Sequence, residues 1–540
     1  MDTLATDVLV IGGGAAGFRA AYEAKRHFPS LRVILATYGR AGRAGSTSMV
    51  ASESLGINAP LDLARDGDCP EAFLEDMIET GAGLADPALC RLLAEESGER
   101  VRELMALGVS FDNGGQPRQR KLSGCSHARS LAVGGATGKA ILRALAAACR
   151  NLTVELLEGV RATALISRDG RVCGVHALQR QRPLQILATS TVLATGGAGR
   201  LFAMNVNTPG TQGDGWAMAL RAGARLTNLE FVQIGPGLVW PPIPFIIHSG
   251  LWRLGPTLMN GRGESFLQRH CPSDVQAADV LEAKADSYPF SVRTPAMYLD
   301  IAIFDELAHG RGTPHGGIYF DLTHVPRRLV LETSPHTCSA LEAAGVDLSR
   351  QAIEIAPLVQ NFTGGVLIDA QGFTGSEGLW AAGEVSGGVH GADRPGGNNL
   401  ADTQVFGYRA GIAAAQAASA THRPRRREEK VETYSPTSSE RRQAVLLQRL
   451  CSQHLTIVRN QAGLKKVLEH IAALRQKAAG SVSLSFSNRL LVSEAIALSA
   501  LARTESRGTH FRNDFPAPDA ALARPFVVTL KSGGGELSVN

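Results

Sequence analysis

A glycine-rich turn at the start of the chain constrains its fold more than any other feature. The apolar run at residues 7–11 is too short for a helix and is bounded by glycine, which is typical of a buried strand. GGGAAG follows at residues 12–17, and alanine-rich helical sequence then leads to a second apolar run at residues 31–35. This order predicts a strand–turn–helix–strand unit that binds the pyrophosphate of a dinucleotide.

Each glycine of this turn has its own part in the prediction. Gly12 allows the tight turn, Gly14 admits the pyrophosphate, and Gly17 lets the helix pack closely against the strand. The helix N-terminus then offers free N–H groups to the phosphates. The second strand ends at Thr37, where many dinucleotide folds carry an acid for the ribose. Only a hydroxyl stands there, so the ribose contact stays open.

Two later strands are also expected to end in glycine turns. STVLATGG at 190–197 and GLWAAGEV at 378–385 each predict a buried strand followed by such a turn. Residues 154–175 alternate between apolar and polar side chains around a turn at 168–170, which indicates a small antiparallel excursion. Parallel strand ends meet at one edge of a sheet, so the turns predict one site for a single long cofactor.

Composition excludes several classes of protein. With 540 residues, 44% hydrophobic and 19% charged, the chain is expected to be soluble and to form about two to four lobes. The net charge of +5 is spread along the chain and argues against nucleic-acid binding. The one basic run, at 423–427, is followed by two glutamates and predicts a solvated linker. The eight cysteines form no CxxC pair, which argues against a metal site or an iron–sulfur cluster in this chain.

The sequence also predicts where the protein works. Scattered cysteines indicate a reduced, cytoplasmic setting. No signal peptide is evident at the N-terminus, and the apolar stretches are interrupted well before membrane-spanning length. We therefore expect no direct membrane insertion, while a membrane-attached partner stays open.

Changes in amino-acid composition and in hydrophobic periodicity divide the chain into domains. We expect an α/β fold with a Rossmann-like domain at 1–229 and 352–420. Proline- and aromatic-rich sequence at 230–351 predicts an inserted α+β domain that caps the cofactor. A linker is expected at 421–436, and helical spacing predicts a C-terminal helical domain with an irregular tail at 437–540.

Ordered motifs along nearly the whole chain carry a family resemblance. They are GGGAAG at 12–17, STSMVA at 46–51, ATGG at 194–197, GDGWAMALRAGA at 213–224, AAGEVSGGVHGADRPGGNNL at 381–400 and ESRGTHFRNDFP at 505–516. The chain resembles the flavoprotein family that includes the succinate dehydrogenase and fumarate reductase flavoprotein subunits, L-aspartate oxidase and the adenylylsulfate reductase flavoprotein. The resemblance implies bound FAD, a capping domain over the isoalloxazine, and hydride chemistry at flavin N5.

The resemblance also implies which residues bind FAD. Some relatives attach the flavin to a histidine just after the serine of the STS-like motif. Thr47 or Ser48 stands there, so FAD is expected to be bound without a covalent bond. The full expected set is Gly12, Gly14, Ala15, Ala16, Gly17, Thr37, Ser46, Thr47, Ser48, Arg161, Ala162, Thr195, Gly196, Gly197, Asp214, Gly383, Glu384, Asn399 and Leu400.

Five residues are candidates for catalysis, namely Arg394, Arg293, His127, Gln360 and His248. The resemblance implies that Arg394, in HGADRPGGNN, holds a substrate carboxylate, and the planar fork of a guanidinium suits that task. Arg293 is the nearest candidate for the family's proton-shuttling arginine, with an alternative alignment at Ile301. His127, in GCSHARS, matches a loop near the flavin in relatives, and both an active-site role and a structural role stay open.

Three polar positions depart from the dicarboxylate-handling relatives. Gly235 stands where those relatives carry a histidine, and Gln360 replaces a second histidine. The threonine and glutamate that hold the substrate in those relatives are absent at residues 248–253, and His248 in this stretch is a candidate to replace the missing histidine. Together these changes predict an organic acid other than a simple C4 dicarboxylate, one that is larger or flatter.

Several functions are compatible with these observations. The leading one is an FAD-dependent oxidoreductase that moves a hydride between flavin N5 and an organic acid. A second is the flavoprotein component of an electron-transfer complex, whose partner supplies an iron–sulfur cluster or another electron carrier. An L-aspartate oxidase-like enzyme and a non-catalytic FAD-binding protein are further alternatives.

Overall fold

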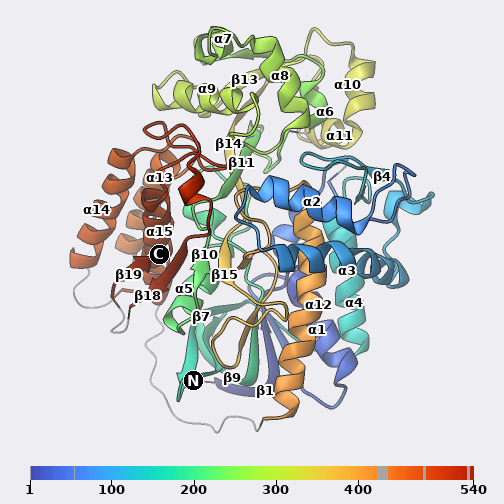
Figure 1. The fold of residues 1–540 in the computed structure, drawn as a ribbon, viewed down its shortest axis with the longest axis vertical. Helices are drawn as coiled ribbons and strands as arrows, with labels where there is room; N and C mark the ends of the chain where they lie inside the picture. The colour runs from blue at the N-terminus through green and yellow to red at the C-terminus, as the bar shows by residue number, and fades with distance from the viewer. Residues whose placement is uncertain (1, 54, 248, 422–435, 478–481, 532–534) are drawn as a thin grey trace.

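A computed structural model describes residues 2–53, 55–247, 249–421, 436–477, 482–531 and 535–540 of the chain (Figure 1). Most of the predicted linker at 421–436, with its basic run, lies outside these residues, as does the candidate His248. Among the described residues, no helix is long and apolar enough to cross a membrane.

A seven-stranded sheet forms the base of the molecule, with the order β6-β2-β1-β9-β8-β7 and with β16 beside β9. Strands β6, β2, β1, β9 and β16 run parallel, whereas β7 and β8 form the predicted antiparallel excursion. The bounds are β1 Asp2–Ile11, β2 Val33–Thr37, β6 Glu155–Glu158, β7 Val160–Arg168, β8 Arg171–Gln179, β9 Arg182–Leu193 and β16 Leu379–Ala381.

The parallel strands end level with one another. Ile11 at the end of β1 pairs with Ala36 of β2 and Leu193 of β9, and Leu193 pairs with Ala381 of β16. In all four strands, the residues near this edge are buried. The glycine turns that follow them therefore meet at one edge, as the sequence predicts.

Two helices pack closely against each other over this sheet. They are α1 (Ala15–His27) and α12 (Asn398–Ser419), which lie side by side although they come from opposite ends of the domain (Figure 1). A Cβ added at Gly411 would overlap the backbone of Ala20, so only glycine permits this approach. The neighbouring helices are α2 (Pro70–Gly81), α3 (Pro87–Ala106), α4 (Thr137–Asn151) and α5 (Asp214–Arg221).

The cap is a separate lobe above the main sheet (Figure 1). Its four-stranded sheet has the order β11-β14-β13-β12, and a second hydrophobic core gathers residues between Leu238 and Ile355. The cap sheet therefore includes β14, which lies beyond the expected boundary at residue 351. The elements are β11 Val232–Trp240, β12 Thr257–Met259, β13 Ile318–Asp321, β14 Ile353–Phe362, α6 Ser249–Trp252, α7 Leu267–His270, α8 Ala277–Asp286, α9 Met297–Ala308, α10 Arg327–Thr333 and α11 Pro335–Ala343.

The C-terminal region combines three helices with two strands. Helices α13 (Ser438–His454), α14 (Gln461–Lys477) and α15 (Leu484–Ala502) form the predicted helical domain. The tail, expected to be irregular, ends in a hairpin that adds to a sheet of the main body, because β18 (Val527–Leu530) pairs with Leu226 and Thr227. Other short strands are β3 Ile57–Asn58, β4 Gln119–Arg120, β5 Ser130–Leu131, β10 Leu226–Thr227, β15 Gly365–Leu367, β17 Ser386–Gly387 and β19 Leu537–Val539.

Candidate functional site

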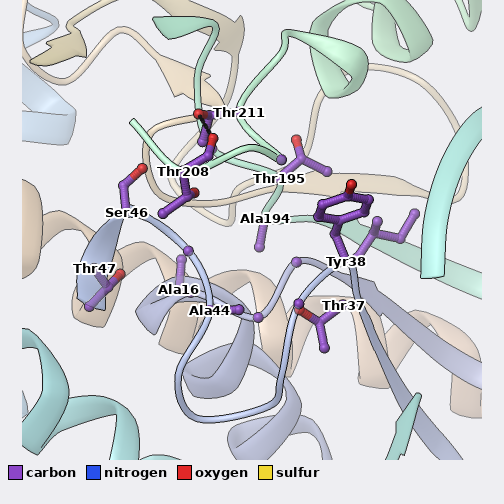
Figure 2. Close-up of a pocket in the computed structure, with 18 of the residues that line it drawn as sticks. Ala16, Thr37, Tyr38, Ala44, Ser46, Thr47, Ala194, Thr195, Thr208 and Thr211 are labelled. Carbon is purple, nitrogen blue, oxygen red and sulfur yellow. Dashed lines mark hydrogen bonds between the residues drawn. The ribbon is translucent and has the colours of Figure 1, made fainter. Parts of the chain in front are cut away.

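A cavity of about 490 Å³ opens where the parallel strands end. Its walls come from the turns after β1, β2, β9 and β16 and from the loops around residues 39–47 and 208–214. Figure 2 shows the small side chains that border it, among them Ala16, Ala44 and Ala194. Small residues keep the space open for a long ligand that runs across the sheet edge.

The three glycines of the first turn have different surroundings. A Cβ added at Gly12, where φ is +126°, would overlap the carbonyl of Ala194, and one at Gly17 would overlap the carbonyl of Gly12. A Cβ at Gly14 would meet only the Thr47 hydroxyl, at 3.4 Å, and otherwise faces open space. Gly12 and Gly17 are thus required by packing, whereas Gly14 keeps the cavity clear at the N-terminus of α1.

Most of the residues expected to bind the cofactor line this cavity. Those that do are Gly12, Gly14, Ala15, Ala16, Thr37, Ser46, Thr47, Arg161, Ala162, Thr195, Gly196, Asp214, Gly383 and Glu384. Gly17, Ser48, Gly197, Asn399 and Leu400 are not part of the lining. Ser48 instead donates its hydroxyl to the carbonyl of Gly45, at 2.8 Å.

Two loops in the lining were missed by sequence reasoning. The first runs from Tyr38 to Gly45 and brings Arg40 and Arg43 to the cavity. The second supplies Pro209, Gly210 and Gln212, together with Thr208 and Thr211, which Figure 2 labels. The repeated glycines of GRAGRAG at 39–45 are a signal for the first loop, because a Cβ on Gly45, where φ is +82°, would lie 3.2 Å from the Cα of Gly14.

Arg161 and Asp214 close one side of the cavity as an ion pair. The guanidinium of Arg161 donates to the Asp214 carboxylate at 2.9 Å, to Gln212 at 2.9 Å and to the Ser485 hydroxyl at 2.6 Å. Asn488 donates to the other Asp214 oxygen at 2.8 Å. Because Ser485 and Asn488 belong to α15, the C-terminal domain helps to hold the cofactor site in shape.

Glu384 is a buried carboxyl group in the cavity lining. Burial raises its pKa to about 7, although it accepts a hydrogen bond from the backbone N–H of Phe362 at 3.4 Å. Glu384 leaves no room for a side chain at Gly197, because a Cβ there would lie 2.6 Å from a Glu384 carboxylate oxygen. The nearby charge of Arg394 favours the ionised carboxylate and opposes the effect of burial.

Arg394 is buried and lies outside the lining of the cavity, but its charge acts on Glu384, which is part of that lining. One guanidinium nitrogen donates to the carbonyl of Pro395 at 3.1 Å, while the buried Nε has no partner among the described residues. None of the ion pairs within the described ranges includes this guanidinium. Burial lowers its pKa to about 10, against the opposing effect of acidic neighbours, Asp393 first. A buried arginine in this state is suited to receive an anion.

The other catalytic candidates lie in different settings. Arg293, on the cap segment before α9, pairs with Glu79 of α2 at 2.7 Å and influences the charge of the buried Asp393. His127 contacts the Ser126 hydroxyl through Nδ1 at 2.7 Å, in a partly exposed loop that does not line the cavity. Gln360 is partly exposed on β14 and is likewise outside the lining.

One further residue near Arg394 was not predicted at all. The ring of Tyr288 lies so close to Gly235 that a Cβ on this glycine would overlap its Cε2, Cζ and hydroxyl oxygen. The hydroxyl is buried and, in the part of the chain that the structure covers, has no hydrogen-bond partner. Because Tyr288 and Gly235 are far apart in the sequence, no local sequence pattern reveals that they pack together.

The residues present fit FAD. The cavity joins four strand ends, it keeps Gly14 clear at a helix N-terminus, and its described lining contains no histidine or cysteine that could form a covalent link to the flavin. Thr47, at the position of the attachment histidine, instead accepts a hydrogen bond from the N–H of Ala15 at 3.1 Å.

Comparisons with known proteins cover nearly the whole chain. Residues 7–400 match the FAD binding domain family, and residues 445–531 match the fumarate reductase flavoprotein C-terminal family. A fumarate reductase (CoM/CoB) subunit of Methanothermobacter marburgensis is 34% identical over 97% of this chain and 97% of its own length. L-aspartate oxidase of Caulobacter vibrioides is 33% identical over 96% of this chain and 95% of its own length.

A solved structure agrees with these relatives. The structure of Mycobacterium smegmatis Sdh1 in complex with UQ1 matches 100% of this chain and 94% of its own, with a TM-score of 0.87 and 30% identity. The expected fold and cofactor are thereby confirmed. The chain belongs to the family of FAD-binding flavoproteins that includes fumarate reductase subunits and L-aspartate oxidases, and it is an FAD-dependent oxidoreductase.

Proposed function

We propose that this oxidoreductase transfers a hydride between flavin N5 and a carbon of an organic acid that is not a simple C4 dicarboxylate. The observation that carries the proposal is Arg394, a buried guanidinium whose Nε has no partner among the described residues and whose charge acts on Glu384 in the cavity lining. A buried guanidinium with an unpaired N–H group is costly, so a site of this kind favours a ligand that accepts hydrogen bonds, such as a carboxylate.

Arg394 would fix the substrate by its carboxylate. A guanidinium offers two parallel N–H groups, and a carboxylate bound through both is held at one angle. Bound FAD supplies hydride transfer to or from the carbon that is held there. The adjacent Asp393 receives hydrogen bonds from the N–H of Arg394 at 2.8 Å and from Gln233 at 3.0 Å, which fixes the loop that carries the guanidinium.

Arg293 is our candidate for moving the proton that accompanies the hydride. It lies on the cap close enough to Asp393 to influence that carboxyl group, and its guanidinium pairs with Glu79, whose side chain is 76% exposed. A proton could therefore pass between solvent and the site along Glu79 and Arg293. His127 and Gln360 are further candidates for contacts with the substrate.

The preference for an acid other than a C4 dicarboxylate rests on two changed positions. Gly235 and Gln360 stand where dicarboxylate-handling relatives carry histidines, so two donors to a second carboxylate are lost. A site that leaves carboxylate oxygens unpaired discriminates strongly against such a ligand. Succinate, fumarate and L-aspartate are therefore expected to be poor substrates.

The proposal is tested with purified protein that contains FAD. Under anaerobic conditions, a panel of organic and amino acids is added, and loss of the oxidised flavin absorbance identifies reducing substrates. Dithionite-reduced enzyme is tested in the same way with unsaturated and oxo acids for the opposite direction. Efficient turnover of succinate, fumarate or L-aspartate would overturn the substrate preference, and no response to any acid would overturn the proposal as a whole.

A second candidate function is that of one component in an electron-transfer complex. One relative is named as a fumarate reductase subunit, which favours a partner protein for this chain also. The eight cysteines are free, and burial raises the pKa of Cys90, Cys149 and Cys451 to about 12, so these thiols are poor cluster ligands. The partner would have to supply the iron–sulfur cluster. Purification of the tagged protein from its source tests this, because an iron-containing protein should accompany it.

A further inference from the structure

The space next to Gly235 is filled by a side chain from another part of the cap. Gly235 lies in β11 with an ordinary strand backbone, yet any Cβ there would overlap the ring of Tyr288. Tyr288 follows α8, and its backbone N–H donates to the Ser123 hydroxyl of the main body at 3.1 Å. A phenol therefore stands where the chain lacks a histidine.

The hydroxyl of Tyr288 is buried against Gly235, and Arg394 is one of the charged groups that act on it. The hydroxyl is shielded from solvent and lacks a hydrogen-bond partner among the described residues, and so does Nε of Arg394. The two groups are close enough to influence each other's charge. A phenol from the cap and a guanidinium from the main body thus lie near each other, and each has a buried polar atom without a partner among the described residues. Buried polar groups normally find a partner, so the two atoms point to a bound ligand.

The surroundings keep this phenol protonated. Burial raises its pKa well above the ordinary value, and the nearby Asp300 carboxylate acts in the same direction, while Arg394 opposes them. Lys284 lies 5.7 Å from the ring centre, but its ammonium group is paired with Asp300 at 2.6 Å. Tyr288 is therefore a neutral hydrogen-bond donor.

We propose that the Tyr288 hydroxyl forms the second contact to the substrate, opposite the carboxylate held by Arg394, and that it selects a neutral oxygen there. This inference rests on the proposed function of Arg394 as the carboxylate clamp. A neutral phenol can donate one hydrogen bond to a carbonyl or carboxylate oxygen but supplies no positive charge for a second anion. The substrate class is then a monocarboxylate with a neutral oxygen function at its other end, such as an oxo acid.

The test compares two acids of nearly the same shape. Levulinate carries one carboxylate and a ketone, and succinate has an anionic oxygen in place of the terminal methyl group of levulinate. Each is titrated into FAD-containing enzyme, and binding is measured by the change in visible absorption of the bound flavin. The wild type is expected to bind levulinate more tightly than succinate.

Two variants remove the proposed contact in different ways. Tyr288→Phe deletes only the hydroxyl and should weaken levulinate binding by roughly tenfold or more, the scale of a hydrogen bond in a buried polar site. Gly235→Ala retains the hydroxyl but must displace it together with the ring, so it should weaken binding similarly. Tyr298→Phe, which alters a tyrosine packed against the cap core, is the matched control and should bind as the wild type does. FAD content and melting temperature should be unchanged in Tyr288→Phe.

The outcomes separate this inference from the proposed function. If Tyr288→Phe binds levulinate as tightly as the wild type while Arg394→Lys loses binding, the tyrosine contact is wrong and the carboxylate clamp stands. If Arg394→Lys binds both acids normally, the clamp fails and the inference that rests on it fails too. Tighter binding of succinate than of levulinate by the wild type would overturn the selection of a neutral oxygen.

Discussion

Glu384 shows how a single buried carboxyl group makes folding stability depend on pH. Its pKa is raised from 4.5 to about 7, so between these values the folded protein binds a proton that the unfolded chain does not. The resulting stabilisation is complete below about pH 4.5 and is lost as pH rises through about 7. Its size is about 3 kcal/mol.

This predicts a difference between the wild type and Glu384→Gln that changes with pH. Without FAD, the wild type should lose about 3 kcal/mol of unfolding free energy relative to the variant between pH 4.5 and pH 7.5, since glutamine does not titrate. Urea unfolding of both proteins at several pH values measures it. A constant difference across this range would show that Glu384 does not titrate there.

Replacing Arg394 by lysine separates the effect of the guanidinium's shape from the effect of its positive charge. Arg394→Lys retains the positive charge but loses the two-point fork, so FAD and the fold should be kept while turnover falls. The expected loss is about 2–4 kcal/mol of transition-state stabilisation. Turnover per bound flavin is measured together with the melting temperature. Near-normal turnover with a lowered melting temperature would instead assign Arg394 a structural role.

At the scale of elements, two glycines of the strand–turn–helix unit have different tasks: Gly14 leaves room for the cofactor, and Gly17 lets the helix pack against the strand. Gly14 has a backbone conformation that any residue can adopt, with φ of −81°, and its missing side chain faces the cavity. Gly14→Val should therefore remove most FAD at little cost to the stability of the FAD-free protein. Gly17→Ala should overlap the Gly12 carbonyl and destabilise the fold by about 1–3 kcal/mol. Flavin content and thermal unfolding measure the two effects, and full FAD occupancy in Gly14→Val would contradict the assignment.

The same elements show what can be predicted from sequence. The glycine turn, the antiparallel excursion and the helices after residue 437 are local patterns, and each is present in the structure. The hairpin of β18 and β19 was missed because its pairing with β10 depends on distant residues. Tyr288 was missed for the same reason: its importance follows from the absent side chain of Gly235, on another strand. Local periodicity carries no information about such contacts.

At the scale of the whole molecule, Arg503 joins the C-terminal region to the main body. Its buried guanidinium pairs with Glu230 at 2.6 Å and with Glu505 at 2.8 Å, and all three side chains are inaccessible to solvent. Two carbonyls of the tail, those of Leu522 and Arg524, accept further hydrogen bonds from this guanidinium at 2.8 and 3.0 Å. Arg503 is thus one of the buried groups that hold the tail against the main body.

Removing this cation should destabilise the entire protein. Arg503→Met leaves Glu230 buried without its partner, and the expected loss is about 3–5 kcal/mol of unfolding free energy. The second change Glu230→Gln should recover part of this loss. Arg327→Met is the matched control, because its pair with Glu342 has the same 2.6 Å distance but is about half exposed and should cost under about 1 kcal/mol. Equal losses in the two single variants would show that burial of the pair is unimportant.

The cap interrupts the domain that binds the cofactor, and this has a consequence for the order of events on the ribosome. The cap core is drawn from one continuous stretch between Leu238 and Ile355, so it can fold as soon as that stretch has emerged. The cofactor cavity also needs Gly383 and Glu384, and its covering helix α12 extends to Ser419. The first domain to begin synthesis is therefore completed after the cap. A nascent chain arrested before β16 should hold a folded cap and an intact glycine turn, yet capture no FAD.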